Sequence, residues 1–289
     1  MMSDVIIIGN GPAGISAALY ATRAGLETIL IGKDSGALEK AEKIENYFGF
    51  SEPISGKNLI DNGVAQAKRL GAKILKSEVV GIGYNDKLTV TTTQDEYSAD
   101  SVIIATGYQR KIPNIKGTKE FEGKGISYCA ICDAFFYKGK DVAVFGCCEY
   151  ALHEALELLP IAKSVTIITN GSKPIDNIPP EIKVITKEVV EFLGEDAISG
   201  VKFKDETSIE VSGVFVAIGI AGSSDLARKL GAQTEGNKIV VDENMSTNIP
   251  GLFAAGDCTG GMLQIAKAVY EGAQAGSEAV KYIRKLKGE

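Results

Sequence analysis

Two segments of the chain follow one pattern, and this pattern constrains the fold more than any other feature. Residues 4–9 form an apolar, strand-like run, a glycine turn follows, and residues 12–25 have the composition of a helix. Residues 140–160 repeat this order, and a further strand-like run follows each helix. Strand–helix–strand units of this kind build parallel sheets with helices packed on them. The chain is therefore predicted to be an α/β protein.

The last apolar block extends the pattern to both ends of the chain. Residues 249–257, IPGLFAAGD, resemble residues 98–107, which end in IIATG. The simplest arrangement is two Rossmann-like domains, each with three layers (ββα/βα), the second inserted in the first. We predict a split first domain of residues 1–114 and 223–289 and an inserted domain of residues 115–222. Residues 114–126, where the first domain passes into the inserted one, mix glycine and lysine and are expected to act as an interdomain linker.

Composition excludes several classes of protein. The chain of 289 residues has a net charge of −6 and no run of basic residues, which argues against nucleic-acid binding. The longest apolar stretch, residues 213–222, is too short to cross a bilayer, and the first residues lack the pattern of a signal peptide. We expect a soluble cytoplasmic protein. Its single histidine, His153, makes a histidine-rich metal site or a Ser-His-Asp triad a poor explanation.

The first glycine turn has the spacing of a dinucleotide-binding loop. Its sequence, GNGPAG, matches G-x-G-x-x-G between a strand and a helix. Gly9 permits the tight turn, Gly11 lets the backbone approach a pyrophosphate, and Gly14 allows the helix to pack closely on the strand. The competing interpretation is a glycine turn without a ligand. The acidic residue that usually holds the ribose is replaced by Lys33, with Asp34 just beyond.

Two of the five cysteines form a CxxC motif. Cys129 and Cys132 can close a small disulfide, and the adjacent Asp133 can exchange a proton with a leaving thiolate. A zinc site and a pair of inert buried thiols are the alternatives, although a structural zinc site needs further ligands that the chain does not supply at a suitable spacing. Cys258 is expected to be a small buried hydrophobic residue.

Together these motifs resemble the low-molecular-weight thioredoxin reductase family over nearly the whole chain. The resemblance rests on GNGPAG, IENYFGF, IIATG, CAICD and IPGLFAAGD. It implies an FAD-binding domain built from both chain ends, an inserted domain that normally binds NADPH, and a homodimer. It also implies that Cys132 faces the flavin, Cys129 attacks thioredoxin and Asp133 acts as acid and base.

The resemblance also implies a set of residues that contact FAD. They are Gly9, Gly11, Pro12, Ala13, Gly14, Asp34, Asn46, Ala105, Thr106, Gly107, Gly256, Asp257, Gln264 and Ile265. Two stretches depart from the family pattern. Residues 35–37, Ser-Gly-Ala, replace Gly-Gly-Gln, and residues 264–265, Gln-Ile, replace Arg-Gln.

The second glycine turn departs more strongly. It keeps Gly146 and Ala151, but Cys148 occupies the position of the middle glycine, where the backbone should approach a pyrophosphate. After the next strand, Thr169, Asn170 and Gly171 stand where the family has basic residues for the 2′-phosphate of NADPH. We therefore predict that NADPH does not bind.

A dithiol flavoprotein without NADPH needs another electron donor. Within this family, the chain resembles the clostridial-type ferredoxin-dependent flavin thioredoxin reductases in its intact FAD motifs, its CxxC-Asp motif and its degraded NADPH motifs. This resemblance implies that FAD takes electrons one at a time from ferredoxin, reduces the Cys129–Cys132 disulfide and then thioredoxin. Low-potential ferredoxins lie near about −400 mV and thioredoxin near about −270 mV, so the transfer is favourable by roughly 6 kcal/mol for two electrons.

Three other functions remain open at this point. They are an NADPH-dependent thioredoxin reductase with a divergent nucleotide site, an FAD dithiol oxidase that passes electrons to oxygen, and a flavin-bound redox sensor without enzymatic activity. Reaction with NADPH, or oxygen consumption with small dithiols, would separate them.

Overall fold

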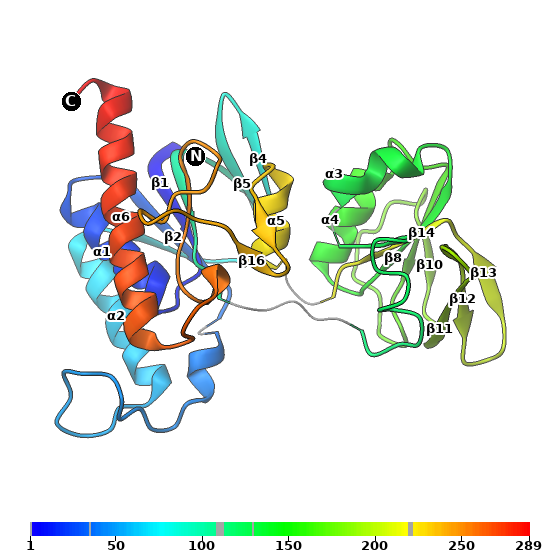
Figure 1. Ribbon diagram of the computed structural model, residues 1–289, viewed down its shortest axis with the longest axis horizontal. Coiled ribbons are helices and arrows are strands. Elements are labelled where there is room, and N and C mark those ends of the chain that lie inside the picture. Colours follow the sequence, from blue (N-terminus) through cyan, green and yellow to red (C-terminus); the bar gives the residue numbers. More distant parts are fainter. Residues whose placement is uncertain (1, 35, 108–112, 129, 219–221) are drawn as a thin grey trace. The chain divides into compact units, whose positions relative to one another are not determined.

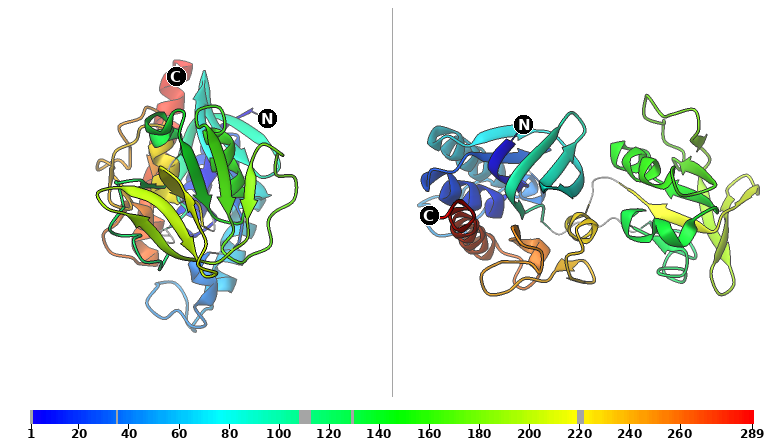
Figure 2. Two further views of the ribbon diagram at one scale, coloured as in Figure 1. Left: turned by 90° about the vertical axis from the view of Figure 1, so that its right-hand side faces the viewer. Right: turned by 90° about the horizontal axis from the view of Figure 1, so that it is seen from above.

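The computed structural model describes residues 2–34, 36–107, 113–128, 130–218 and 222–289, without the side chains at positions 37, 40, 131 and 132. The chain forms two compact units. Unit 1 comprises residues 1–109 and 222–289, and unit 2 comprises residues 110–221. The two ends of the chain, blue and red in Figure 2, therefore belong to the same unit. This arrangement confirms the predicted insertion of one α/β unit into another.

Unit 1 is built on a seven-stranded sheet in which one edge of β6 pairs with β1 and the other edge pairs with two strands, β5 and β17. The first part of β6 pairs antiparallel with β5, and its last three residues pair parallel with β17. Strands β3, β2, β1 and β6 run parallel in that order. The strands are β1 (Met2–Ile8), β2 (Thr28–Gly32), β3 (Lys73–Lys76), β4 (Val79–Asn85), β5 (Lys87–Thr92), β6 (Glu96–Ile104) and β17 (Leu252–Ala254).

Three long helices of unit 1 lie together against the sheet (Figure 1). They are α1 (Pro12–Arg23), α2 (Gly56–Leu70) and α6 (Ile265–Lys287). Helices α1 and α6 approach closely because glycines of α6 face α1. A Cβ atom at Gly272 would lie 2.0 Å from the carbonyl oxygen of Ala13, and one at Gly276 would lie 2.6 Å from that of Ala17. The remaining elements are η1 (Ala37–Lys40), α5 (Ser223–Lys229), β15 (Thr234–Glu235), β16 (Lys238–Ile239) and η3 (Asp257–Thr259).

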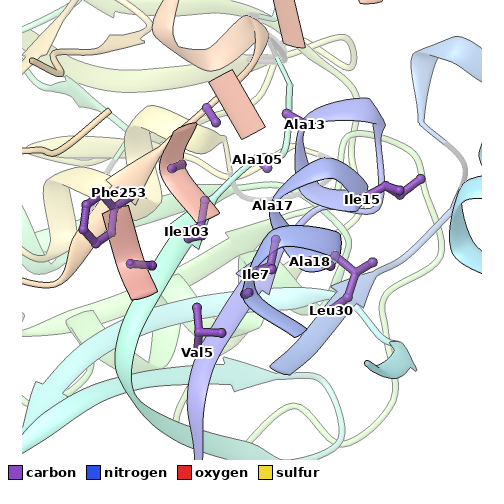
Figure 3. Close-up of a cluster of buried hydrophobic side chains, with 14 of the residues drawn as sticks. Val5, Ile7, Ala13, Ile15, Ala17, Ala18, Leu30, Ile103, Ala105 and Phe253 are labelled. Carbon is purple, nitrogen blue, oxygen red and sulfur yellow. The ribbon is translucent and has the colours of Figure 1, made fainter. Parts of the chain in front are cut away.

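The core of unit 1 is continuous from the sheet to these helices. Alanines on α1 pack on aliphatic side chains of the sheet, as Figure 3 shows for Ala17 and Ala18 beside Ile7 and Leu30. All four side chains are almost fully buried. Small residues on α1 let the helix lie close to the strands, which places its first turn beside the ends of β1 and β6.

Unit 2 has a parallel sheet of five strands in the order β10-β9-β8-β14-β7. Helices α3 and α4 lie on one side of this sheet and the antiparallel strands β11, β12 and β13 on the other (Figure 1). The helices are α3 (Ala130–Asp133), η2 (Ala134–Tyr137) and α4 (Glu149–Leu158). The strands are β7 (Ile126–Ser127), β8 (Asp141–Phe145), β9 (Ser164–Ile168), β10 (Lys183–Ile185), β11 (Val189–Gly194), β12 (Ile198–Phe203), β13 (Ser208–Glu210) and β14 (Gly213–Val216).

The two units repeat one plan with one difference. Strands β1, β2, β3 and β6 of unit 1 correspond in order to β8, β9, β10 and β14 of unit 2, and α1 corresponds to α4. In unit 1, helix α2 connects β2 to β3. In unit 2, residues 169–182 connect β9 to β10 without a helix, and all of them are described. The predicted α/β class with two Rossmann-like units is confirmed.

One expectation about the chain path is wrong. Residues 114–126 were expected to form a linker, but they belong to unit 2. The reason is Phe121, which is 2% exposed and packs in the core of that unit. Lys116 adds an ion pair with Glu191 of β11, at 2.6 Å. Burial of the Phe121 ring thus anchors this stretch to unit 2, although the rest of the stretch is rich in glycine and lysine.

No helix in the described part of the chain is long and apolar enough to span a membrane.

Candidate active site

The first glycine loop packs so closely that two of its residues can only be glycine. Gly9 has a φ of +108°, and a Cβ atom there would lie 2.3 Å from the carbonyl oxygen of Ala105. A Cβ atom at Gly14 would lie 1.7 Å from the carbonyl oxygen of Gly9. The end of β1, the end of β6 and the first turn of α1 therefore meet without side chains between them, as the sequence predicted for a tight turn.

Gly11 is glycine for a different reason. It is the N-cap of α1, and nothing lies within 4 Å of the position that its Cβ would occupy. Pro12 follows at the first helical position, so the free backbone N–H groups of the first turn are those of Ala13 and Gly14. Open space in front of a helix N-terminus is an anion site. This cradle fits the pyrophosphate of FAD.

The loop after β6 is tied to the start of α5. The hydroxyl of Ser223 donates to the carbonyl oxygen of Gly107, and that of Thr106 lies 2.6 Å from the Ser223 oxygen. Gly107 has a φ of +77° and open space at its Cβ position. Sequence reasoning identified Thr106 and Gly107 but missed Ser223, which lies more than one hundred residues further along the chain.

The turn after β17 is held by a buried ion pair. The Lys267 ammonium contacts the carbonyl oxygen of Gly256 at 2.8 Å and the Glu271 carboxylate at 3.0 Å. Glu271 also accepts the N–H of Gly256 at 2.8 Å. Asp257 is next in this turn, and its pKa is raised by burial and by the charge of Glu271, while Lys267 opposes the shift. Lys267 and Glu271 were missed, although their i,i+4 spacing is a pairing signal.

Other predicted contact residues of unit 1 lie in two places. The side-chain amide of Asn46 donates to Gln264 at 2.9 Å, which joins two segments that are 218 residues apart. Gln264 is the N-cap of α6 and Ile265 is the first residue of that helix. Asp34 is exposed and accepts the N–H of Gly36 at 2.8 Å, so it closes a local turn after β2.

The CxxC motif belongs to unit 2. Cys129 lies outside the described residues, and Cys132 lies in α3 with its side chain not described. Asp133 ends α3 and accepts the hydroxyl of Ser127 at 2.6 Å. Burial and the negative charge of Asp133 raise the pKa of Tyr137. The Asp133 carboxyl, next to Cys132 in sequence, can take up or release a proton.

The second glycine loop keeps the geometry of the first but not its opening. A Cβ atom at Gly146 would lie 2.0 Å from the carbonyl oxygen of Ala217, which parallels Gly9 and Ala105. Cys148 is the N-cap of α4, as Gly11 is of α1. Its Sγ lies 3.6 Å from the carbonyl oxygen of Ala217. A side chain thus stands where unit 1 leaves free space.

The turn after β9 is closed by its own polar groups. Thr169 donates to the carbonyl oxygen of Ser172 at 2.6 Å, and Asn170 accepts the N–H of Val189 at 2.7 Å. The side chain of Glu188 lies within 3.2 Å of the position that a Cβ of Gly171 would occupy. Glu188 is paired with Lys204 at 2.6 Å, so the side chain beside this turn is a carboxylate that already has a cation as partner.

The remaining cysteines lie in different environments. Cys258 is fully buried, and burial raises its pKa to about 12, so it is a small apolar residue as predicted. Cys147 and Cys148 are free thiols. Among the described residues, no group of three or more side chains is arranged to hold a metal ion.

Comparisons with known proteins agree on one family. The model of the pyridine nucleotide-disulphide oxidoreductases matches residues 3–272. A thioredoxin reductase of Aquifex aeolicus (strain VF5) is 38% identical over 88% of this chain and 84% of that protein.

Two crystal structures are informative. The atypical thioredoxin reductase TRi from Desulfovibrio vulgaris Hildenborough is 41% identical, with a TM-score of 0.91 and coverage of 98% of both chains. A ferredoxin-flavin thioredoxin reductase from Clostridium acetobutylicum is 33% identical, with a TM-score of 0.71 and coverage of 100% of this chain and 99% of that chain.

Proposed function

The chain belongs to the pyridine nucleotide-disulphide oxidoreductase family as a flavoprotein thioredoxin reductase, and we propose that it reduces thioredoxin with electrons from ferredoxin rather than from NADPH. In this proposal residues 1–114 and 223–289 bind FAD. Residues 115–222 carry the dithiol on a nucleotide-binding module that has lost its ligand. The active protein is a homodimer.

FAD binding is supported by the first glycine loop. Gly11, Ala13 and Gly14 would surround the pyrophosphate, and the turn at Asp257 would hold the flavin side of the cofactor. The flavin, when bound, accepts electrons singly and supplies them in pairs. The chain contributes the cradle, and the Lys267–Glu271 pair keeps the Asp257 turn in place.

The observation that carries the choice of donor is Cys148. Its side chain stands at the N-cap of α4, where a pyrophosphate would need open backbone, and it contacts Ala217. The turn at Thr169–Gly171 contains no lysine or arginine, and the side chain beside Gly171 is that of Glu188, which pairs with Lys204. Each lost charge-assisted phosphate contact costs on the order of 1.5–3 kcal/mol, so two such losses reduce affinity by several orders of magnitude.

The dithiol then acts on thioredoxin by exchange. The Cys129 thiolate attacks one sulfur of the thioredoxin disulfide and forms a mixed disulfide. Cys132 attacks Cys129 in turn, which releases reduced thioredoxin and closes the Cys129–Cys132 disulfide. Asp133 donates and accepts the proton that accompanies these steps, and Ser127 holds its carboxylate in place at 2.6 Å.

The decisive experiment is anaerobic titration of the flavin spectrum in the stopped-flow instrument. We expect reduced ferredoxin to bleach the flavin, and NADPH and NADH to leave it oxidised over seconds. Bleaching by NADPH would refute the proposal and identify an ordinary reductase with a divergent site. In a separate aerobic assay, oxygen consumption with small dithiols would instead indicate an oxidase, and no turnover with any donor would indicate a sensor.

A matched pair of variants tests the reason given for the donor. Cys148→Gly opens the second loop, and Cys147→Gly removes a neighbouring thiol of the same loop without changing the N-cap. We expect Cys148→Gly, and not Cys147→Gly, to gain measurable affinity for adenine dinucleotides. Binding is measured by the quenching of intrinsic tyrosine fluorescence. Equal behaviour of the two variants would show that Cys148 is not what closes the site.

A further inference from the structure

The end of strand β2 lies beside the first glycine loop. The N–H of Gly9 donates to the carbonyl oxygen of Ile31 at 2.7 Å, which brings Gly32, the last residue of β2, next to the loop. In dinucleotide-binding folds an acidic residue at this strand end hydrogen-bonds the ribose of the adenosine. Gly32 has no side chain, so the last residue of β2 cannot supply this contact.

The two residues that follow Gly32 already have partners within the protein. The Lys33 ammonium contacts the carboxylate of Glu78 at 2.5 Å. The Asp34 carboxylate accepts the N–H of Gly36 at 2.8 Å and closes a local turn. These contacts use both side chains beyond the end of the strand, so the ribose needs a partner from another segment.

The side chain that fills the space at Gly32 is that of Asn10. A Cβ atom at Gly32 would lie 2.3 Å from Cγ, 2.5 Å from Oδ1 and 2.7 Å from Nδ2 of Asn10. The amide therefore occupies the position from which the side chain of an acid would start. Asn10 is half-buried, and no residue in the described part of the chain hydrogen-bonds its amide. It stands between Gly9 and Gly11, at the phosphate cradle.

Unit 2 has the same backbone contact without this arrangement. The N–H of Gly146 donates to the carbonyl oxygen of Ile168 at 3.0 Å, so the next residue, Thr169, takes the place of Gly32. Thr169 has a side chain, which is hydrogen-bonded within its own turn. The residue after Gly146 is Cys147 rather than an asparagine. A glycine paired with an amide thus occurs in the unit whose cradle is open and not in the unit whose cradle is blocked.

We propose that Asn10 is the ribose-binding residue of the FAD site, in place of the acid that the end of β2 lacks. This inference rests on FAD binding in the proposed function and deepens it, because it names the residue that recognises the adenosine half of the cofactor. An amide suits two neighbouring hydroxyl groups, because its oxygen accepts from one and its NH2 group donates to the other. Gly32 is then glycine because a side chain there would displace this amide.

The test measures the contribution of the ribose hydroxyl groups alone. The full chain is loaded with FAD, and displacement of FAD by ADP or by 2′,3′-dideoxy-ADP is followed as the rise in flavin fluorescence. The two competitors share the adenine and both phosphates, and they differ only in the hydroxyl groups. The ratio of their Kd values therefore cancels any effect of a substitution on the phosphate cradle.

In the unchanged protein we expect ADP to bind about tenfold more tightly than dideoxy-ADP, because the analogue loses the hydrogen bonds of the ribose. Asn10→Ala should bring the ratio close to one. Asn85→Ala removes an exposed asparagine at the end of β4, in the same unit, and should leave the ratio in place. An unchanged ratio in Asn10→Ala, or an equal fall in both variants, would overturn the proposal.

Gly32→Ala gives a second test in which Asn10 itself is unchanged. Its new Cβ must push the Asn10 amide aside, so the ratio should fall as it does in Asn10→Ala. A ratio equal to that of the unchanged protein would show that the position of the amide is not what selects the ribose.

Asn10→Asp keeps the test decisive if Asn10→Ala folds poorly. Its carboxylate has nearly the shape of the amide and accepts from both hydroxyl groups, so the preference for ADP should survive. Loss of the preference in Asn10→Asp, or its loss in Asp34→Ala but not in Asn10→Ala, would refute the assignment to Asn10. A full chain that bound no FAD would refute the proposed function together with this inference, whereas an unchanged ratio in FAD-loaded Asn10→Ala would refute this inference alone.

Discussion

Replacement of Gly272 by alanine tests whether close contact of α1 and α6 positions the first glycine loop. Glycine to alanine inside a helix normally stabilises a protein by about 1 kcal/mol. Here the new Cβ would lie 2.0 Å from the carbonyl oxygen of Ala13, and contacts below 3.0 Å are essentially never seen. Overpacking costs about 1–3 kcal/mol, and a backbone atom that cannot rotate away favours the upper value. We expect a net loss of about 2 kcal/mol.

The assay is urea unfolding followed by circular dichroism and by release of flavin fluorescence, which reports on unit 1. Both midpoints should fall for Gly272→Ala, and flavin should be released first because Ala13 lies in the first turn of α1. Gly276→Ala is the matched control, with the same gain in helix propensity but a gap of 2.6 Å to Ala17. It should be less damaging. A higher midpoint for Gly272→Ala, or a worse outcome for Gly276→Ala, would refute the reasoning.

Three further predictions concern single side chains. Lys267→Met should raise the Kd for FAD by about tenfold or more, because it leaves the Glu271 carboxylate unpaired beside the Gly256 turn; equilibrium dialysis measures it. Cys258 should resist iodoacetamide at pH 8 in the folded protein while Cys147 is alkylated, because burial raises the Cys258 pKa to about 12; peptide mass spectrometry separates the two. Asp257→Asn should stabilise the apoprotein at neutral pH. The raised pKa means that folding favours the protonated carboxyl, so the wild-type protein loses this stability as pH rises through the folded-state pKa, and the difference between the two proteins should vanish at low pH.

The glycine loops could be predicted because their requirements are visible in residue identity. Gly9 and Gly14 admit no Cβ, and at Gly11 the absence of a side chain leaves open space in front of α1. The strands and helices around them follow from local apolar patterns. The same reasoning identified Cys148 as the residue that departs from the plan.

The partners of these residues could not be predicted in the same way. Ser223, Lys267 and Glu271 look like ordinary helical residues, and their roles arise from contacts with distant turns. Asn46 and Gln264 meet although 218 residues separate them. The linker assigned to residues 114–126 failed because composition was weighed above the single buried ring of Phe121.

One edge of β6 pairs with both β5 and β17, and this affects the order in which the protein folds during synthesis. Strand β17, which pairs with the last residues of β6, begins at Leu252. Helix α6, which packs on α1, begins at Ile265. At about 5–20 residues per second, β17 leaves the ribosome roughly 8–30 s after β6. Unit 2 is continuous and emerges in that interval, so it can fold first. Until α6 arrives, the side of α1 that packs against Gly272 and Gly276 stays exposed to solvent and to chaperones.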